Sequence, residues 1–536
     1  MLFWETSIGQ YTNEKLQEFL LSAYNPPGTS TDAPPYPDTL FTDYKNAGFD
    51  TFLWIYDDDS LLNKIHQYKF KYFINIQSIG DDNDDVEFLL RGENDEAPPD
   101  MPEYLLQRLD SLVDKYKNDP YLIGYYICDE PFANAFDNIA KVINRIRSKD
   151  SSRVCYVNLW PYFPNDPDDT TPEEGDNNYL EEFIQKTHIS LLSYDRYIFY
   201  NLIEGENYDD VEEYFNQIER IRAKALKYDI PFCNIVQAIG TNGTSVSWDA
   251  PGNGEHLDWR TPSESEHRWL VYTSLAYGVH GIVWFHWDCC DWGVIENPDR
   301  DTVYPSIKSI NHEIDSLKNI MFNLKTKSVY HLNGIQITRI NNIPDILFEA
   351  SQDAQLIVGT FETKDENYKY FMLVNKDYED SISTQLKMNY SLKHLQFFNV
   401  KNNTWEEMPF EPDSEGIVFT VNLRAGGGKL FRFQEIAPIP SELDFSINPN
   451  PFSNITTISY TIPEMFHGTN YHKVELHIYD TKGKKVATLI NQTQSSGQYT
   501  IDIQPDYLSN GLYICVLKID NKNFVKKVIK TKSLQN

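Results

Sequence analysis

Short apolar runs alternate with amphipathic segments over the first 324 residues of the chain. Runs such as 52–56, 154–159 and 281–285 have the length and aromatic content of buried strands, and each precedes a segment with apolar residues at helical spacing. Seven such pairs can be followed, and Leu2–Ile8 can supply an eighth strand. We therefore predict an α/β fold in which residues 1–324 form a (β/α)8 TIM barrel.

An open, doubly wound sheet is the alternative arrangement for such an alternating pattern. That fold usually carries a glycine-rich phosphate-binding turn after its first strand. The sequence has no such turn there, which favours the closed barrel.

The pattern changes to short alternating strands without helices after residue 324. Residues 325–438 are predicted to form a β-sandwich domain, and the proline-containing segment 437–440 a linker. Further strand patterns, separated by turn sequences, predict a second β-sandwich over residues 439–536.

The chain is strongly acidic, with a formal net charge of −32. This charge argues against nucleic acid or an anionic membrane as a partner. No apolar run is long enough for a transmembrane helix. The six cysteines lack the spacing of metal ligands or of a disulfide framework. We expect neither a metal nor a cofactor.

Several short motifs mark the C-terminal domain: Pro449–Phe452, Leu476–Asp480, Gly483–Val486, Leu508–Tyr513 and Val525–Val528. Together they resemble the C-terminal sorting domain of the type IX secretion system of Bacteroidetes. The resemblance implies that the protein is a client of the type IX secretion machinery and is secreted or held at the cell surface. Such proteins carry a signal peptide, and Met1–Thr6 has no basic region or cleavage site, so we expect a trimmed N-terminus.

The apolar run at 121–128 ends at the tripeptide Asp129-Glu130-Pro131. In a parallel barrel, chemistry takes place at the carboxyl ends of the strands, and a Glu beside an apolar strand can have a pKa high enough for a general acid. The alternative interpretation is that Asp129 caps a helix beginning near Pro131. The barrel, this motif and the following sandwich resemble glycoside hydrolases of the clan A type. That resemblance implies that Glu130 is the acid/base residue.

Glycoside hydrolysis also needs a second carboxylate. In clan A enzymes it is a Glu at the end of the seventh strand, where this sequence has Gln237. Carboxylates near predicted strand ends could replace it: Asp195, Asp288, Glu255 and Asp258. We favour Asp195, because Tyr194 and Tyr197 beside it could hold a sugar, and place Asp288 second.

Further polar and aromatic residues near predicted strand ends are expected to bind substrate: Asn75, Asp129, Asn158, Trp160, Tyr194, Tyr197, Gln237, Trp284, His286 and Trp287. Indole rings stack on sugar faces, and amides hydrogen-bond to hydroxyl groups. The sequence thus predicts a secreted glycoside hydrolase that acts on a poly- or oligosaccharide. The alternative is a non-catalytic glycan-binding protein on the same barrel scaffold, which Gln237 supports.

Overall fold

The computed structural model places most residues between 15 and 532. The described ranges are 15–29, 35–81, 85–93, 96–160, 176–201, 207–209, 211–241, 258–288, 293–295, 300–333, 346, 348–351, 353–363, 368–388, 392–413, 416–435, 443–463, 471–504 and 508–532. The chain divides into two compact units, Met1–Gln434 and Glu435–Asn536.

Eight parallel strands form the central sheet of the N-terminal unit, in the order β1-β11-β9-β6-β5-β4-β3-β2. They are β1 (Leu20–Ala23), β2 (Thr51–Ile55), β3 (Lys71–Asn75), β4 (Leu122–Asp129), β5 (Val154–Leu159), β6 (Leu192–Asp195), β9 (Phe232–Gln237) and β11 (Gly281–Phe285). The two end strands of this order are in contact, and Ser22 Oγ in β1 donates a 2.8 Å hydrogen bond to the Thr51 carbonyl in β2. The predicted barrel is confirmed.

The first barrel strand is β1. The sequence analysis placed this strand at Leu2–Ile8, which lies outside the described residues, and that prediction was wrong. β1 is only four residues long, and all four are buried. Apolar residues in and before it recur at helical spacing, at Leu16, Phe19, Leu20 and Ala23. Parallel pairing with β11 along the whole of β1 overrides this local pattern.

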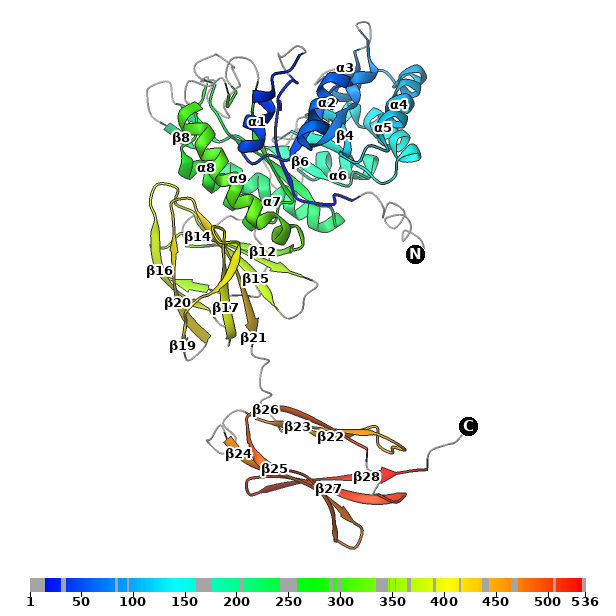
Figure 1. The fold of residues 1–536 in the computed structure, drawn as a ribbon, viewed down its shortest axis with the longest axis vertical. Coiled ribbons are helices and arrows are strands. Elements are labelled where there is room, and N and C mark those ends of the chain that lie inside the picture. Colours follow the sequence, from blue (N-terminus) through cyan, green and yellow to red (C-terminus); the bar gives the residue numbers. More distant parts are fainter. Residues whose placement is uncertain are drawn as a thin grey trace. The chain divides into compact units, whose positions relative to one another are not determined.

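Helices pack around the parallel sheet, and their apolar faces cover its outer side (Figure 1). They are α1 (Asp38–Asn46), α2 (Asp59–Tyr68), α3 (Val86–Arg91), α4 (Glu103–Tyr116), α5 (Phe136–Lys149), α6 (Asp176–Thr187), α7 (Val211–Tyr228), α8 (Glu264–Tyr277) and α9 (Arg300–Phe322), with short 3-10 turns η1 (Ile76–Ile79) and η2 (Ala133–Ala135). Helix α8 begins with a capping box between Ser263 and Glu266, and it ends at Gly278, whose φ of 87° suits glycine.

Two apolar cores result from the alternation of side chains along the barrel strands. One fills the barrel interior and includes Phe73, Tyr156 and Val283. The other lies between the strands and the helices. Which core a strand residue joins therefore shows which way its side chain points.

A small antiparallel sheet, which the sequence analysis did not predict, joins two loops at the carboxyl ends of the barrel strands. Its strands are β7 (Phe199–Asn201), β8 (Asn207–Asp209) and β10 (Asp258–Trp259), in the order β10-β7-β8. β7 follows β6, and β10 follows β9, so the sheet connects the loops after two neighbouring barrel strands.

The remainder of the N-terminal unit is a β-sandwich with its own apolar core. One sheet has the order β12-β14-β15-β21-β17-β18 and the other β13-β16-β20-β19. The strands are β12 (Lys325–Leu332), β13 (Phe348–Ala350), β14 (Leu356–Glu362), β15 (Lys369–Asn375), β16 (Ile382–Met388), β17 (Leu392–Asn399), β18 (Thr404–Glu407), β19 (Glu411–Asp413), β20 (Gly416–Leu423) and β21 (Gly428–Glu435). Trp269 in α8 donates a 3.0 Å hydrogen bond to the Lys376 carbonyl, which ties the sandwich to the barrel.

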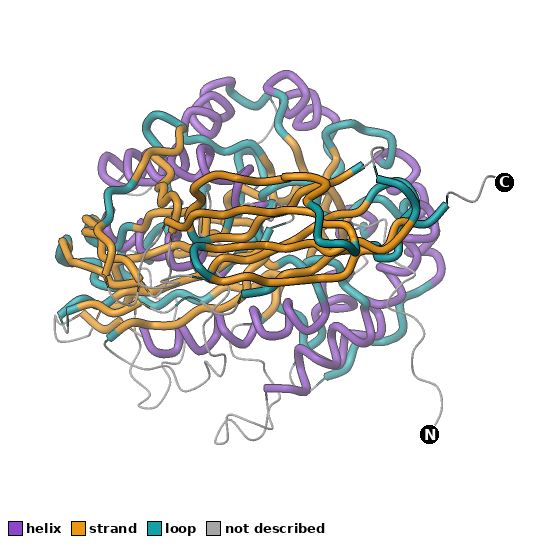
Figure 2. Tube along the Cα trace, turned by 90° about the horizontal axis from the view of Figure 1, so that it is seen from below, coloured by secondary structure: helices purple, strands orange, loops and turns teal. Residues whose placement is uncertain are grey.

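The described elements of the C-terminal unit are all strands (Figure 2). They are β22 (Phe445–Asn448), β23 (Thr456–Ile462), β24 (Tyr471–Asp480), β25 (Lys485–Ser495), β26 (Gly497–Ile503), β27 (Gly511–Ile519) and β28 (Lys522–Lys530). They form sheets of order β22-β23-β26 and β25-β24-β27-β28, which share one apolar core. The predicted succession of a barrel and all-β sandwiches is therefore confirmed.

Candidate active site

Three neighbouring barrel strands bring two carboxylates and one amide together at their carboxyl ends. Asp129 ends β4 and is paired in register with Asn158 of β5, and Asp195 ends β6. The Asn158 Nδ2 group donates hydrogen bonds to Asp129 Oδ1 at 3.0 Å and to Asp195 Oδ1 at 2.8 Å. Because a side-chain amide carries two N–H groups, one asparagine can hold both carboxylates.

An irregularity in β4 sets the direction of Asp129. The pairing of β4 with β5 shifts between Tyr126 and Cys128. Tyr126 lies in the barrel interior, whereas Ile127 and Cys128 both join the core between strands and helices. Two consecutive outward residues reverse the alternation, so Asp129 comes to lie beside Asn158.

Glu130 follows Asp129 in a left-handed backbone conformation, with φ of 47°. This conformation is unfavourable for a residue with a side chain, and neighbouring groups hold it in place. The Glu130 amide donates a 2.9 Å hydrogen bond to the Asn158 carbonyl, and Arg91 Nε donates one of 3.4 Å to the Glu130 carbonyl. Arg91 Nη2 also lies 3.5 Å from Glu130 Oε2, and its guanidinium lies 5.5 Å from the ring centre of Trp160.

Burial raises the pKa values of all three carboxyl groups, and repulsion from neighbouring carboxylates adds to it for Glu130 and Asp195. Desolvation and the charges of Asp195 and Asp129 raise the pKa of Glu130 to about 10, against the opposing charge of Arg91. Desolvation and the charge of Asp129 raise the pKa of Asp195 to about 7, against its hydrogen bond from Asn158. Desolvation also raises the pKa of Asp129. At neutral pH the site therefore holds a protonated Glu130 beside a partly ionised Asp195.

Aromatic residues from two loops and one strand pack beside Asp195. The ring of Tyr197 is stacked on Phe285, with centroids 4.7 Å apart, and meets the edge of Trp259 at 4.8 Å. Tyr197 also forms a hydrogen bond that lowers the pKa of Asp195. Trp259 lies in β10, so the loop after β9 folds back beside Tyr197.

A second aromatic group lies beside Asp129. The hydroxyl groups of Tyr24 and Tyr126 are 3.0 Å apart, and a hydrogen bond from Tyr24 lowers the pKa of Asp129. Tyr24 meets Trp54 edge to face, with ring centroids 6.3 Å apart. The sequence analysis did not include these aromatic residues, since Tyr24 follows the misplaced first strand. Trp54 lies near the carboxyl end of β2, and this position was the signal that could have identified it.

Gln237, at the end of β9, has a structural role in the free protein. Its side chain is fully buried, and its Oε1 accepts hydrogen bonds from the amides of Ile198 and Phe199 at 3.2 and 3.1 Å. Its Nε2 donates to the carbonyls of Phe199 and Arg260 at 3.1 and 2.9 Å. An amide can both donate and accept in this way, whereas an ionised carboxylate only accepts. Gln237 thus holds the chain segment directly after Asp195.

Several residues predicted to bind substrate point away from the carboxylates. Tyr194, Trp284 and Trp287 belong to the core between strands and helices. Trp284 Nε1 donates a 2.8 Å hydrogen bond to Asn311 Oδ1 in α9, and Trp287 packs edge to face on Tyr44. Tyr194 precedes the inward-facing Asp195, so strand alternation turns it outward.

The remaining predicted residues also lie close to strand ends. Asn75 Oδ1 accepts a hydrogen bond from the Gln77 amide and so caps η1. His286 and Asp288 follow β11 and are buried, and burial lowers the pKa of His286 to about 3. Glu255 lies outside the described residues, and Asp258 begins β10. Among the residues that the structure places, no group of three or more His, Cys, Asp or Glu side chains could hold a metal ion.

The C-terminal part of the chain matches a known protein family. Residues 446–531 match the family model for the secretion system C-terminal sorting domain. The C-terminal unit is a secretion sorting domain. The protein is therefore a client of the type IX secretion machinery, directed to the cell surface or beyond, as its motifs predicted. In the described part of the chain, no helix is both long enough and apolar enough to span a bilayer.

Solved structures with similarity to this chain include several glycoside hydrolases. An α-L-fucosidase isoenzyme 2 from Paenibacillus thiaminolyticus has a TM-score of 0.48 at 9% identity, over 79% of this chain and 100% of that one. A glycoside hydrolase family 5 protein from Bacteroides vulgatus ATCC 8482 has a TM-score of 0.46 at 12% identity, over 78% and 88%. No curated protein matches the chain by sequence. The activity of this chain has to be argued from its own site.

Proposed function

We propose that the protein is a secreted glycoside hydrolase in which Glu130 is the general acid and Asp195 the second carboxylate. The observation that carries this proposal is the placement of the two carboxyl groups: Glu130 follows β4 and Asp195 ends β6, on either side of β5, whose Asn158 holds Asp195 beside Asp129. Burial and neighbouring charges separate their pKa values, about 10 for Glu130 and about 7 for Asp195. Such a pair supplies one protonated and one ionised group at the same pH, which glycoside hydrolysis requires.

In the proposed reaction, the Glu130 proton moves to the glycosidic oxygen while the bond from that oxygen to the anomeric carbon breaks. The Asp195 carboxylate either attacks the anomeric carbon or removes a proton from the attacking water. Asp195 is favoured over Asp288 because its charge raises the pKa of Glu130, and because Asn158 holds it beside Asp129. The anomeric configuration of the first product, followed by NMR, distinguishes the two routes.

The aromatic residues on either side of the carboxylates support a carbohydrate substrate. Tyr197 and Trp259 lie beside Asp195, and Tyr24 and Trp54 lie on the side of Asp129. Aromatic rings of this kind offer apolar faces to the C–H groups of a sugar. Trp160, which packs against Arg91, adds an indole close to Glu130.

Hydrolysis of a panel of plant, algal and host glycans by the wild type and by Glu130→Gln tests the proposal. Removal of the general acid should lower the rate by about 10²–10⁴-fold while glycan binding is retained. Glu87→Gln is the matched control, since Glu87 lies 3.8 Å from the same Arg91 but its side chain is 65% exposed. Equal rates for Glu130→Gln and the wild type would refute the assignment.

A non-catalytic glycan-binding protein is the second candidate. Gln237 favours it, because this residue occupies the expected position of the second carboxylate and its amide is bound to backbone groups on both sides. A binding protein would hydrolyse no glycan in the panel and would bind one of them equally well after Glu130→Gln.

A further inference from the structure

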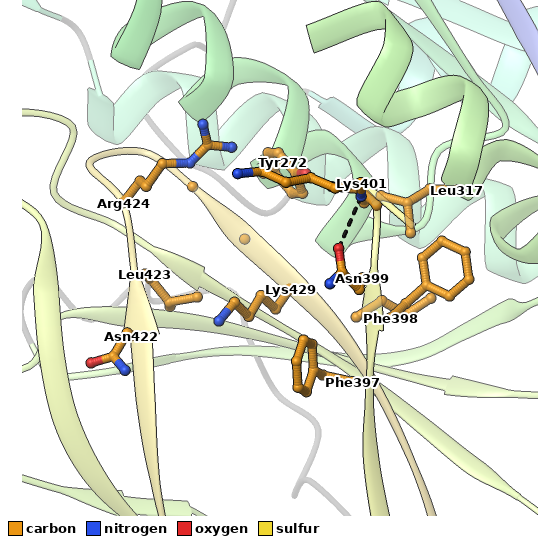
Figure 3. Close-up of a pocket in the computed structure, with 14 residues that line it drawn as sticks. Tyr272, Leu317, Phe397, Phe398, Asn399, Lys401, Asn422, Leu423, Arg424 and Lys429 are labelled. Carbon is orange, nitrogen blue, oxygen red and sulfur yellow. Dashed lines mark hydrogen bonds between the residues drawn. The ribbon is translucent and has the colours of Figure 1, made fainter. Parts of the chain in front are cut away.

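A cavity of about 360 Å³ lies where the barrel helices meet the first β-sandwich. Tyr272 of α8 and Leu317 of α9 line one side of it, and residues of β17, β20 and β21 with their loops line the other (Figure 3). None of the residues of the proposed active site borders it. We refer to it as the junction cavity.

The junction cavity is lined by cations in a chain that is otherwise acidic. Its lining residues include Lys401, Arg424 and Lys429 but no Asp or Glu, although the chain has a net charge of −32. Lys401 follows β17, Arg424 directly follows β20, and Lys429 lies in β21. Figure 3 shows the three side chains around the same space, Arg424 and Lys401 near Tyr272 and Lys429 near Leu423. A local excess of positive charge attracts anions.

The protein itself neutralises only part of this charge. Arg424 Nη2 lies 2.7 Å from Glu313 Oε1, and Glu313 also accepts a 2.6 Å hydrogen bond from the Tyr272 hydroxyl. Within the described residues, no carboxylate forms an ion pair with Lys401 or Lys429. Burial and the neighbouring charge of Arg424 lower the pKa of Lys429. An anion bound beside Lys429 would offset both the burial of its ammonium group and the repulsion from Arg424.

Apolar groups border the same space. The Lys429 ammonium lies 5.2 Å from the ring centre of Phe397, which is itself partly exposed. Leu317 and Leu423 add aliphatic surface. The volume lies at the lower end of the usual range for small-molecule sites, about 300–1,000 Å³, which suits one or two sugar rings.

We propose that the junction cavity binds an anionic saccharide, whose carboxylate or sulfate group contacts Lys429, Arg424 and Lys401 while its ring packs on Phe397. The anionic class follows from the three cations. The saccharide class rests on the proposed function, since a hydrolase gains from a second site that holds its polymer. Such a site raises the effective concentration of substrate near the barrel.

Calorimetric titration of the full chain tests this proposal, in the Glu130→Gln background so that no probe is cleaved. The probes are a trigalacturonate, its neutral methyl ester, a sulfated galactan oligosaccharide and sodium sulfate. One of the two charged oligosaccharides should bind, and the neutral ester should not bind. Which of the two binds shows whether the site takes a carboxylate or a sulfate group. Binding should weaken as ionic strength rises. The proposal would be overturned if the methyl ester bound as tightly as trigalacturonate. It would also be overturned if sulfate alone bound as tightly as both oligosaccharides.

Substitutions locate the binding to the junction cavity. Lys429→Met and the exposed Lys401→Gln should each weaken binding about tenfold or more, because each removes a charged hydrogen-bond donor. Lys393→Met is the control, as an exposed lysine of β17 outside the cavity. Unchanged affinity in both cavity variants would refute the site. In protein that retains Glu130, neither substitution should alter hydrolysis of a small neutral glycoside, so the binding result is independent of the Glu130→Gln test of activity.

Discussion

The protonated state of Glu130 should reduce the stability of the protein in a pH-dependent way. Its pKa is about 10 in the folded state, against an ordinary value of 4.5. Between these values folding requires uptake of a proton, so the free energy of unfolding falls by ~1.4 kcal/mol for each pH unit. Below pH 4.5 both states hold the proton and no penalty exists. At pH 7 the penalty reaches ~3 kcal/mol.

Glu130→Gln is neutral in both states and keeps the shape of the protonated acid. The N-terminal unit of this variant should therefore be more stable than that of the wild type by up to ~3 kcal/mol at pH 7. The difference should be larger at pH 8.5 and absent at pH 4. Urea unfolding monitored by tryptophan fluorescence at these three pH values measures the difference. Glu87→Gln, at an exposed position, should show no such trend. A Glu130→Gln variant no more stable than the wild type at pH 8.5 would refute a raised pKa, and with it the role as proton donor.

Three further outcomes are expected. The rate of hydrolysis should have a bell-shaped pH dependence, because Asp195 must be ionised, above about pH 7, and Glu130 protonated, below about pH 10; a rate that does not fall below about pH 7 would contradict the assignment. Asn158→Leu removes hydrogen bonds that favour ionised Asp195, so the acidic limb of the profile should move to higher pH, and a fixed limb would refute the role of Asn158. Gln237→Glu should destabilise the N-terminal unit by about 3 kcal/mol in urea unfolding, because a buried carboxylate cannot donate to the Phe199 carbonyl; wild-type stability would contradict this.

The position of the site could be predicted from sequence because the apolar run of β4 stops at Asp129. Strand ends in a parallel barrel share one edge, so Asn158 and Asp195, each at the end of its own apolar run, could be placed near it. The helix ends were equally readable, since Ser263 and Gly278 are a cap and a stop signal. These features depend on local sequence alone.

The direction of individual side chains could not be read in the same way. The irregular pairing at Tyr126 and Cys128 depends on the neighbouring strand, and it decides that Asp129 meets Asn158. Trp284 was placed in the site although strand alternation turns it toward α9. Arg91 lies in α3, a short helix before β4 that the sequence analysis did not assign, so its contact with Glu130 is visible only in three dimensions.

The charge balance of the site explains why Gln237 is compatible with the proposed catalysis. Burial already raises the pKa values of Asp129, Glu130 and Asp195, the charge of Asp129 raises those of the other two further, and the counter-charge that acts on Glu130 is that of Arg91. A fourth carboxylate at the end of β9 would add repulsion at a buried position. The neutral Gln237 instead forms hydrogen bonds with backbone groups of Ile198 and Phe199, which follow Asp195, and these bonds fix this strand end. If Asp195 provides the second carboxylate, an amide at position 237 that positions the segment beside it is consistent with an active hydrolase.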